Sequence, residues 1–189
     1  MKFLQRVLIS VGLLGGLTLP RAGVAHDGWV EISPTLVEKN QPATIALIQG
    51  NHSNEHKSYR IAGKWDAKYT TLAVVDPKGK TNVLTDRLID FGEDADAIGP
   101  KGPKGFFLAP FVPEDEGLYQ AVGRQARTLQ HGDGPKIVTI RVAKAAFAAF
   151  KAPTVSAAKT LKGFDRQIAD NDAVEFIPVN NPLAVFSGG

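Results

Sequence analysis

The residues of this 189-residue chain best suited to chemistry are its four histidines, His26, His52, His56 and His131. The chain has no cysteine, and its one methionine is the initiator. Thiolate and thioether ligands are therefore excluded, which leaves imidazole, carboxylate and amine groups. Nitrogen ligands of this kind suit Cu(II) and Ni(II), so the composition favours a nitrogen-ligated transition-metal site.

His26 would offer a second metal-binding group, its α-amine, if the chain were cut immediately before it. Residues 1–25 begin with two cations, continue with an apolar run over 7–17 and end with small residues at Gly23 and Ala25, which is the pattern of a cleavable secretory signal. The run of about 11 residues is shorter than the roughly 20 of a spanning helix, so we predict a signal peptide and no membrane anchor after cleavage. Cleavage would free the α-amine of His26, whose ordinary pKa of about 7.7 to 8.0 allows it to bind metal near neutral pH.

The amine and ring Nδ1 of His26 could then chelate one metal ion, and one further imidazole would complete a T-shaped, three-nitrogen site called a histidine brace. His52 is the first choice for that ligand because it lies in a polar loop directly after a predicted strand. His131, in a Gly-rich turn, could approach from a second loop. For His56 and His131, simple solvation remains the alternative.

The elements that must position these residues are predicted to be β-strands. Short segments rich in Val, Ile, Thr, Tyr and Phe recur between Gly, Pro, Asn or Asp, which is typical of a sandwich or barrel. The predicted strands are Trp29–Ile32, Ala43–Gln49, Tyr69–Val75, Asn82–Leu84, Gly105–Phe111, Gly117–Arg124, Ile137–Val142 and Ala173–Val179. We therefore expect an all-β, immunoglobulin-like sandwich over residues 26–179.

Several segments between the predicted strands have recognisable sequence patterns. Residues 76–80 (Asp-Pro-Lys-Gly-Lys) have the composition of a tight turn between antiparallel strands, and a Gly-x-Tyr step at Tyr119 is common where a strand of an immunoglobulin-like sandwich begins. Residues 94–105 have the composition of an exposed loop. The Ala/Phe segment near 144–151 could form a short helix or extend a strand, and the pattern does not decide between them.

The sequence gives little support to the hypothesis that the protein is an enzyme. It contains no Gly-x-Ser-x-Gly elbow, no His-Glu-x-x-His and no phosphate-binding loop, and we expect no enzyme. The acidic residues from Asp90 to Asp96 do not match a calcium-loop template and are better explained as a solvated loop. Trp29, Trp65 and Tyr69 could form a sugar-binding platform, although aromatic residues in a β protein are more often core.

The charge of the chain is consistent with an exported protein that does not bind nucleic acid. The formal net charge of +3 includes three cations of residues 1–25, so the processed chain is close to neutral. The oxidising compartment offers no disulfide to a chain without cysteine, so stability must come from a packed core. About 160 residues are enough for one such domain.

Several segments resemble one family of periplasmic proteins. They are residues 25–34 (Ala-His-Asp-Gly-Trp-Val-Glu-Ile-Ser-Pro), 41–45 (Gln-Pro-Ala-Thr-Ile), 50–52 (Gly-Asn-His), 157–161 and 174–182. The family is grouped as a domain of unknown function and is associated with nickel or cobalt uptake. The resemblance implies a β-sandwich, a periplasmic location and a role in handling a transition metal, with His26 and His52 on the family's histidine positions. Members usually continue into a second immunoglobulin-like domain, so we expect 180–189 to be a tail or the start of a missing domain.

The leading hypothesis is a periplasmic accessory protein that binds Ni, Co or Cu through His26 and His52, with His131 as a further candidate, and presents the metal to a membrane uptake system. The alternative is a β-sandwich binding module that recognises a protein or a glycan and uses no metal.

Overall fold

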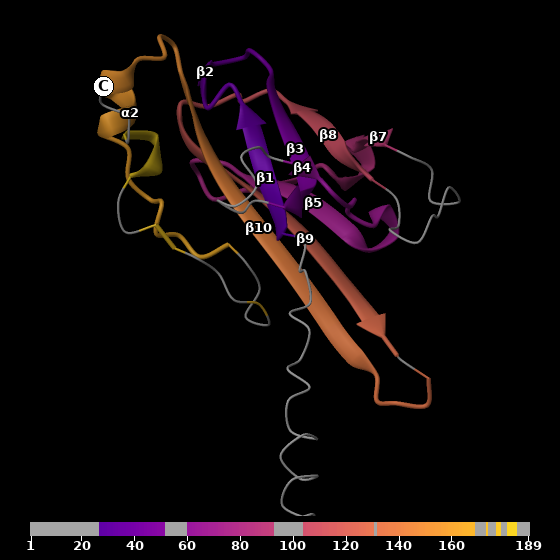
Figure 1. The fold of residues 1–189 in the computed structure, drawn as a ribbon. Coiled ribbons are helices and arrows are strands. Elements are labelled where there is room, and N and C mark those ends of the chain that lie inside the picture. The colour runs from indigo at the N-terminus through magenta and orange to yellow at the C-terminus, as the bar shows by residue number, and fades with distance from the viewer. Residues whose placement is uncertain are drawn as a thin grey trace, which may run out of the picture.

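A computed structural model describes residues 27–51, 60–92, 104–130, 132–168, 173, 177–178 and 181–184. Its two β-sheets pack face to face (Figure 1). Sheet A contains β1 (Asp27–Ser33), β3 (Ala43–Asn51), β8 (Gly105–Phe111) and β7 (Ile89–Gly92) in that order, and β4 (Arg60–Ile61) pairs with the end of β3. Sheet B contains β2 (Leu36–Glu38), β10 (Ile137–Phe150), β9 (Gly117–Leu129), β5 (Thr70–Val75) and β6 (Thr81–Val83).

The strand order identifies the type of sandwich. Lettered in chain order, β1, β3, β8 and β7 correspond to strands A, B, E and D of the immunoglobulin fold, and β10, β9, β5 and β6 correspond to G, F, C and C′. The first strand divides between the sheets: β1 pairs antiparallel with β3, and β2 pairs parallel with β10. The predicted all-β, immunoglobulin-like sandwich is confirmed.

Alternation along the strands builds the core. The side chains of Val30 and Ile32 in β1 and of Ala43, Ile45 and Leu47 in β3 are buried between the sheets, and those of Glu31, Ser33 and Thr44 between or beside them are exposed. From the other sheet, β5 contributes Leu72 and Val74, and β9 and β10 contribute Tyr119 and Phe147. The rings of Tyr119 and Phe147 stack with centroids 5.0 Å apart. Facing side chains of the two sheets thus form one hydrophobic core.

The expected strands are largely confirmed, with one correction and one open alternative resolved. Ala173, Ile177 and Pro178, the described residues of the predicted strand 173–179, belong to no strand, so that prediction is wrong for them. The segment near 144–151, where a short helix was one of two expectations, is strand as far as Phe150. The Ala and Phe residues of this segment pair with β9, and both faces of the strand are at least partly covered. A strand covered on both faces does not need alternating polar residues, so the sequence lacks the pattern that would have marked it.

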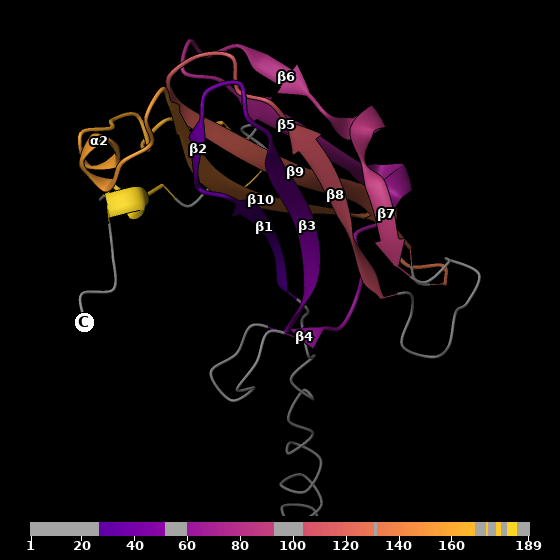
Figure 2. The ribbon, with the colours of Figure 1, turned by 90° about the horizontal axis from the view of Figure 1, so that it is seen from above.

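The chain beyond the sandwich is short and partly helical. Helix α2 (Val155–Lys159) is capped by the hydroxyl of Thr154, which accepts a hydrogen bond from the amide of Ala157. The 3-10 helix η3 (Pro182–Ala184) lies against α2, and the side chain of Asn181 donates to the carbonyl of Ala158 at 2.7 Å. Both elements lie to one side of the sheets (Figure 2).

Two strands of sheet B extend beyond the rest of the sandwich. The last residues of β5 and β9 to pair are Thr70 and Gln125, and beyond that level residues 126–129 and 137–140 pair only with each other. The resulting two-stranded ribbon, here called the arm, projects from one end of the molecule (Figure 1). Ile137 and Val138 on it are 53% and 63% exposed.

Candidate functional site

His26, His52, His56 and His131 all lie outside the described residues, so the candidate site is built from the residues next to them. Asp27 begins β1, Asn51 ends β3, and Gln130 and Gly132 lie on either side of position 131 at the tip of the arm. These three chain segments leave the sheets at the same end of the sandwich, here called the histidine end.

The pairing of β1 with β3 relates the two favoured ligands. Asp27 lies opposite Gly50 in an antiparallel ladder, where facing Cα atoms are about 4.5 to 5.5 Å apart. Consecutive Cα atoms are about 3.8 Å apart, so the chain tethers His26 one residue and His52 two residues from this paired position. The strand register therefore brings together the residues that adjoin the two histidines, although positions 26 and 52 are far apart in the sequence.

A buried tryptophan supports this end of the sandwich from within. Trp65 is 1% exposed, and its indole Nε1 donates to the carbonyl of Ile48 at 2.8 Å, which ties it to β3 close to Gly50. The ring lies so close to β1 that a Cβ at Gly28 would be 3.0 Å from it and 2.6 Å from Cδ of Arg141. A glycine at 28 thus lets β1 pass over Trp65 and Arg141.

Two cations lie over aromatic rings near this end of the sandwich. The guanidinium of Arg141 lies 5.7 Å from the ring centroid of Trp65 and donates to Oε1 of Gln125 at 3.4 Å. Lys64 is nearly buried, pairs with Asp90 at 2.6 Å and lies 5.2 Å from the ring centroid of Phe107. Cation–π and ionic interactions therefore hold both cations in place at this end of the sandwich.

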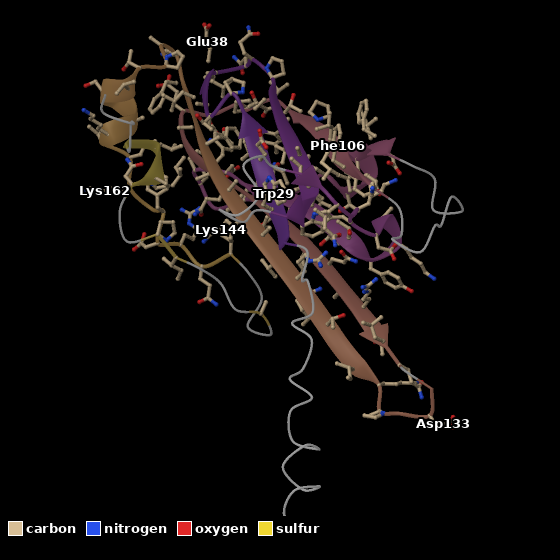
Figure 3. All side chains as sticks on the ribbon, viewed as in Figure 1. Trp29, Glu38, Phe106, Asp133, Lys144 and Lys162 are labelled. Atoms are coloured by element: carbon tan, nitrogen blue, oxygen red, sulfur yellow. The ribbon has the colours of Figure 1, made fainter. Side chains whose placement is uncertain are left out.

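The tip of the arm, where Gln130 and Gly132 lie on either side of position 131, is remote from the paired ends of β1 and β3. Gln125 pairs with Arg141, which reaches Gly28, and Leu129 lies four residues further along β9. At about 3.3 Å per residue, that stretch alone extends about 13 Å beyond the level of β1. Figure 3 shows Asp133, which follows His131 by two residues, at the far tip. Asp27 and Asn51 are therefore much closer to each other than either is to the tip of the arm.

The acidic residues singled out in the sequence have structural partners where they are described. Asp90 pairs with Lys64, and Asp115 pairs with Lys78 at 2.8 Å. Glu93, Asp94 and Asp96 lie outside the described residues. Within the described ranges, no three His, Asp or Glu side chains come together as a metal-binding group.

The three aromatic residues considered as a sugar-binding platform are not brought together. Trp65 is buried in the core, Tyr69 is 40% exposed, and Trp29 faces outward from β1. Because a stacking platform needs its rings on one accessible surface, the interpretation of Trp65 as a core residue is the correct one.

An apolar outer face on sheet A was not predicted. Strand pairing places Trp29, Ile48, Phe106 and Phe91 in one row across the sheet, with Ala46, Leu108 and Ile89 in the next row. The rings of Phe91 and Phe106 stack at 5.5 Å with an interplanar angle of 7°. Phe91 and Ile89 are 46% and 51% exposed, and Ile48, Ile61, Phe106 and Leu108 line a shallow depression of about 230 Å³. We call this surface the apolar face.

The opposite end, here called the turn end, is closed by hydrogen bonds. Oδ1 of Asp76 accepts from the amides of Lys78 and Lys80 at 2.9 and 2.8 Å, within the predicted turn. The hydroxyl of Tyr119 donates to the carbonyl of Asp115 and accepts from its amide, both at 2.9 Å, which is the tyrosine corner of immunoglobulin-like domains. Burial raises the pKa of the Tyr119 phenol, and the hydrogen bond to Lys78 lowers the pKa of Asp115 and raises that of Lys78.

Comparison with known proteins adds no assignment. No protein-family model matches the chain, and no curated protein matches it. Among the described helices, none is long and apolar enough to cross a membrane.

Proposed function

We propose that this chain is a periplasmic accessory protein that binds a transition-metal ion, Cu(II), Ni(II) or Co(II), at the histidine end and presents it to a membrane uptake system. The observation that supports the proposal is the pairing of Asp27 with Gly50, which tethers His26 and His52 to one point of sheet A. A binding role with no catalytic step is proposed.

The donor set fits such an ion. The α-amine and Nδ1 of a terminal His26 form a chelate, and an imidazole from His52 adds a third nitrogen, which is the ligand type that Cu(II) and Ni(II) prefer. The paired ends of β1 and β3, held over the buried ring of Trp65, provide a rigid base for this set. A rigid base lowers the entropy cost of bringing ligands together.

His131 is the weaker candidate for the third ligand. The arm carries Gln130 away from the paired ends of β1 and β3, so joint ligation would require the tip to approach from outside. We therefore assign His52 the larger contribution to affinity.

Calorimetric titration of the processed chain with Cu(II) and with Ni(II) tests the proposal, after mass spectrometry has verified that the chain starts at His26. His52→Ala should weaken binding at least about tenfold, whereas the matched His56→Ala variant should bind as the native chain does. Absence of binding above the background of loop histidines, or equal losses from both variants, would reject the proposed site.

A second candidate function is a protein-binding module that uses no metal, and the apolar face favours it. Exposed apolar surfaces of this kind on a soluble domain mark interaction sites more often than chance. The same titration separates the two candidates, since this module would take up no metal stoichiometrically.

A further inference from the structure

The apolar face of sheet A projects on one side and is hollow on the other. The projecting side is the edge strand β7, where Ile89 and Phe91 are 51% and 46% exposed. The ring of Phe91 stacks against that of Phe106 on β8, which holds the projecting side chain in place. The shallow depression lies over β3, two strands from β7 (Figure 2), and Ala46 at its centre is the smallest residue of its row.

Strand register places the projecting and hollow sides on the same levels of the sheet. Ile89 pairs with Leu108, and Leu108 pairs with Ala46, so the three lie in line across β7, β8 and β3. Phe91 and Ile48 are in line in the same way, because both pair with Phe106. A two-fold axis along β8, in the plane between two facing copies, would put β7 of each copy over β3 of the other at the same level. The projecting side of each copy would then enter the hollow side of the other.

The chemistry of the apolar face suits a second apolar sheet better than a charged partner or a small ligand. Glu31, on the edge strand β1, is the only charged residue in the two rows of the face. The depression has a volume of about 230 Å³, below the roughly 300 to 1,000 Å³ of small-molecule pockets. A charged partner would therefore find little to bind, whereas burial of apolar side chains against each other needs no charge.

The size of the overlap sets the expected strength of such a contact. With the axis along β8, three strands of each copy overlap and β1 lies at the rim, which leaves Glu31 in contact with solvent. Strands about 4.8 Å apart and about 20 Å long give an overlap of roughly 14 by 20 Å. This is smaller than the roughly 800 Å² per partner of a standard interface, so the contact belongs with weak, reversible associations. We expect a Kd of about 10 to 100 µM.

We propose that the apolar face is the interface of a two-fold homodimer, in which sheet A packs against sheet A of a second copy. Ile89 of each copy lies over Ala46 of the other, and Leu108 lies near the axis and faces its own counterpart. Facing sheets of this kind pack about 10 Å apart with nearly aligned strands. The interface is independent of the metal proposal. It assigns a second copy to the surface for which the second candidate function requires an unrelated protein.

Sedimentation equilibrium of the processed chain tests the interface, with EDTA present so that bound metal plays no part. The mean mass should rise from that of a monomer toward that of a dimer between about 1 and 300 µM. Ile89→Glu should weaken association at least about tenfold, because it would bury a charge against apolar side chains. Val83→Glu is the matched control, since Val83 is 67% exposed but lies on sheet B, and it should associate as the native chain does.

Two further variants separate the proposed two-fold packing from nonspecific apolar association. Ala46→Lys alone should weaken association about tenfold, but an equimolar mixture of Ala46→Lys and Ile89→Glu chains should associate more tightly than either variant alone, because the axis brings positions 46 and 89 together. The native chain has no cysteine, so Leu108→Cys introduces a single thiol near the axis. A bismaleimide that spans about 10 Å should link two Leu108→Cys chains efficiently, and two Val83→Cys chains poorly.

Four results would overturn the proposal. They are a mass that stays monomeric up to about 300 µM, association that Ile89→Glu does not weaken, a mixture that associates no better than its components, and equal cross-linking of Leu108→Cys and Val83→Cys. If Ala46→Lys does not fold, as judged by circular dichroism, the comparison of the two cysteine variants decides.

Discussion

At the turn end the chain reverses within a few residues, and side-chain hydrogen bonds hold the reversals at 76–80 and 115–119, whereas at the histidine end β9 and β10 continue into the arm (Figure 1). At the turn end, the carboxylate of Asp76 and the hydroxyl of Tyr119 bind backbone groups. Lys78 and Asp115 form an ion pair there. At the histidine end, the main interior contact is the indole of Trp65 beneath β1 and β3.

The difference indicates how stability and function are divided along this fold. Tight, hydrogen-bonded turns hold the register of the sheets, and long connections at the other end are free to carry binding groups. Substitutions at the turn end should therefore lower stability without changing metal affinity, and substitutions of the histidines should do the reverse. The exception is Trp65, which lies at the histidine end and still belongs to the core.

Trp65→Ala should have the largest effect on stability. Loss of a fully buried aromatic side chain, with the hydrogen bond to Ile48, should lower the free energy of unfolding by about 3 to 5 kcal/mol, measured by urea denaturation. Tyr69→Ala, at an exposed aromatic residue, is the matched control and should cost less than about 1 kcal/mol. Equal losses would show that Trp65 does not support the histidine end.

Asp76→Ala should have the next largest effect. The carboxylate is 8% exposed and accepts two backbone amides, so its removal should lower the free energy of unfolding by about 2 to 3 kcal/mol. Asp76→Asn keeps an acceptor oxygen and should lose less, and Asp86→Ala, at an exposed carboxylate, should lose little. An Asp76→Ala variant as stable as Asp86→Ala would mean that the turn is held by other contacts.

Tyr119→Phe removes the hydroxyl of the tyrosine corner and leaves the ring in the core. The free energy of unfolding should fall by about 1 to 2 kcal/mol because the amide and carbonyl of Asp115 lose their partner. Tyr69→Phe should be neutral. The affinity for Cu(II) should not change in Tyr119→Phe, and a change there would contradict the separation of the two ends.

Asp115→Asn should give the smallest effect, visible as a change in pH dependence. The pKa of Asp115 is lowered in the fold, so its contribution to stability is present above the unfolded value of 3.8 and is lost as the pH falls through the lowered value. The pKa of Lys78 is raised, so the contribution persists below 10.5 and is lost as the pH rises through the raised value.

The melting temperatures of the native chain and of Asp115→Asn should therefore differ most at pH values between the pKa of Asp115 and that of Lys78. They should become similar at lower and at higher pH. Because both groups are exposed, salt at about 0.5 M should reduce the difference. A difference that does not vary with pH or salt would show that the Asp115 side chain acts through a contact that does not depend on its charge.

Much of the fold follows from local patterns in the sequence. The strand segments that became β3 and β5, the turn at Asp76 and the Gly-x-Tyr step at Tyr119 each depend on neighbouring residues, and the structure confirms them. The short strands β2, β4 and β7 were missed because two to four residues are too few to show a period.

Other features depend on register, which sequence alone does not provide. The apolar face was not recognised because residues 89–92 belong to no predicted strand, and only strand pairing shows that Ile89, Phe91 and Phe106 share the outer surface. The same holds for the candidate site. The sequence singled out His26 and His52, but the pairing of Asp27 with Gly50 is what gives a reason to prefer His52 over His131.

The most direct test of the metal proposal is to add one residue before His26 and to measure Cu(II) affinity by calorimetry. The extension keeps every side chain but moves the free α-amine away from the imidazole, so affinity should fall about 10- to 100-fold, as it should in His26→Ala. If the extended chain binds Cu(II) as tightly as the chain that starts at His26, the terminal amine is not a ligand and the proposed site is wrong.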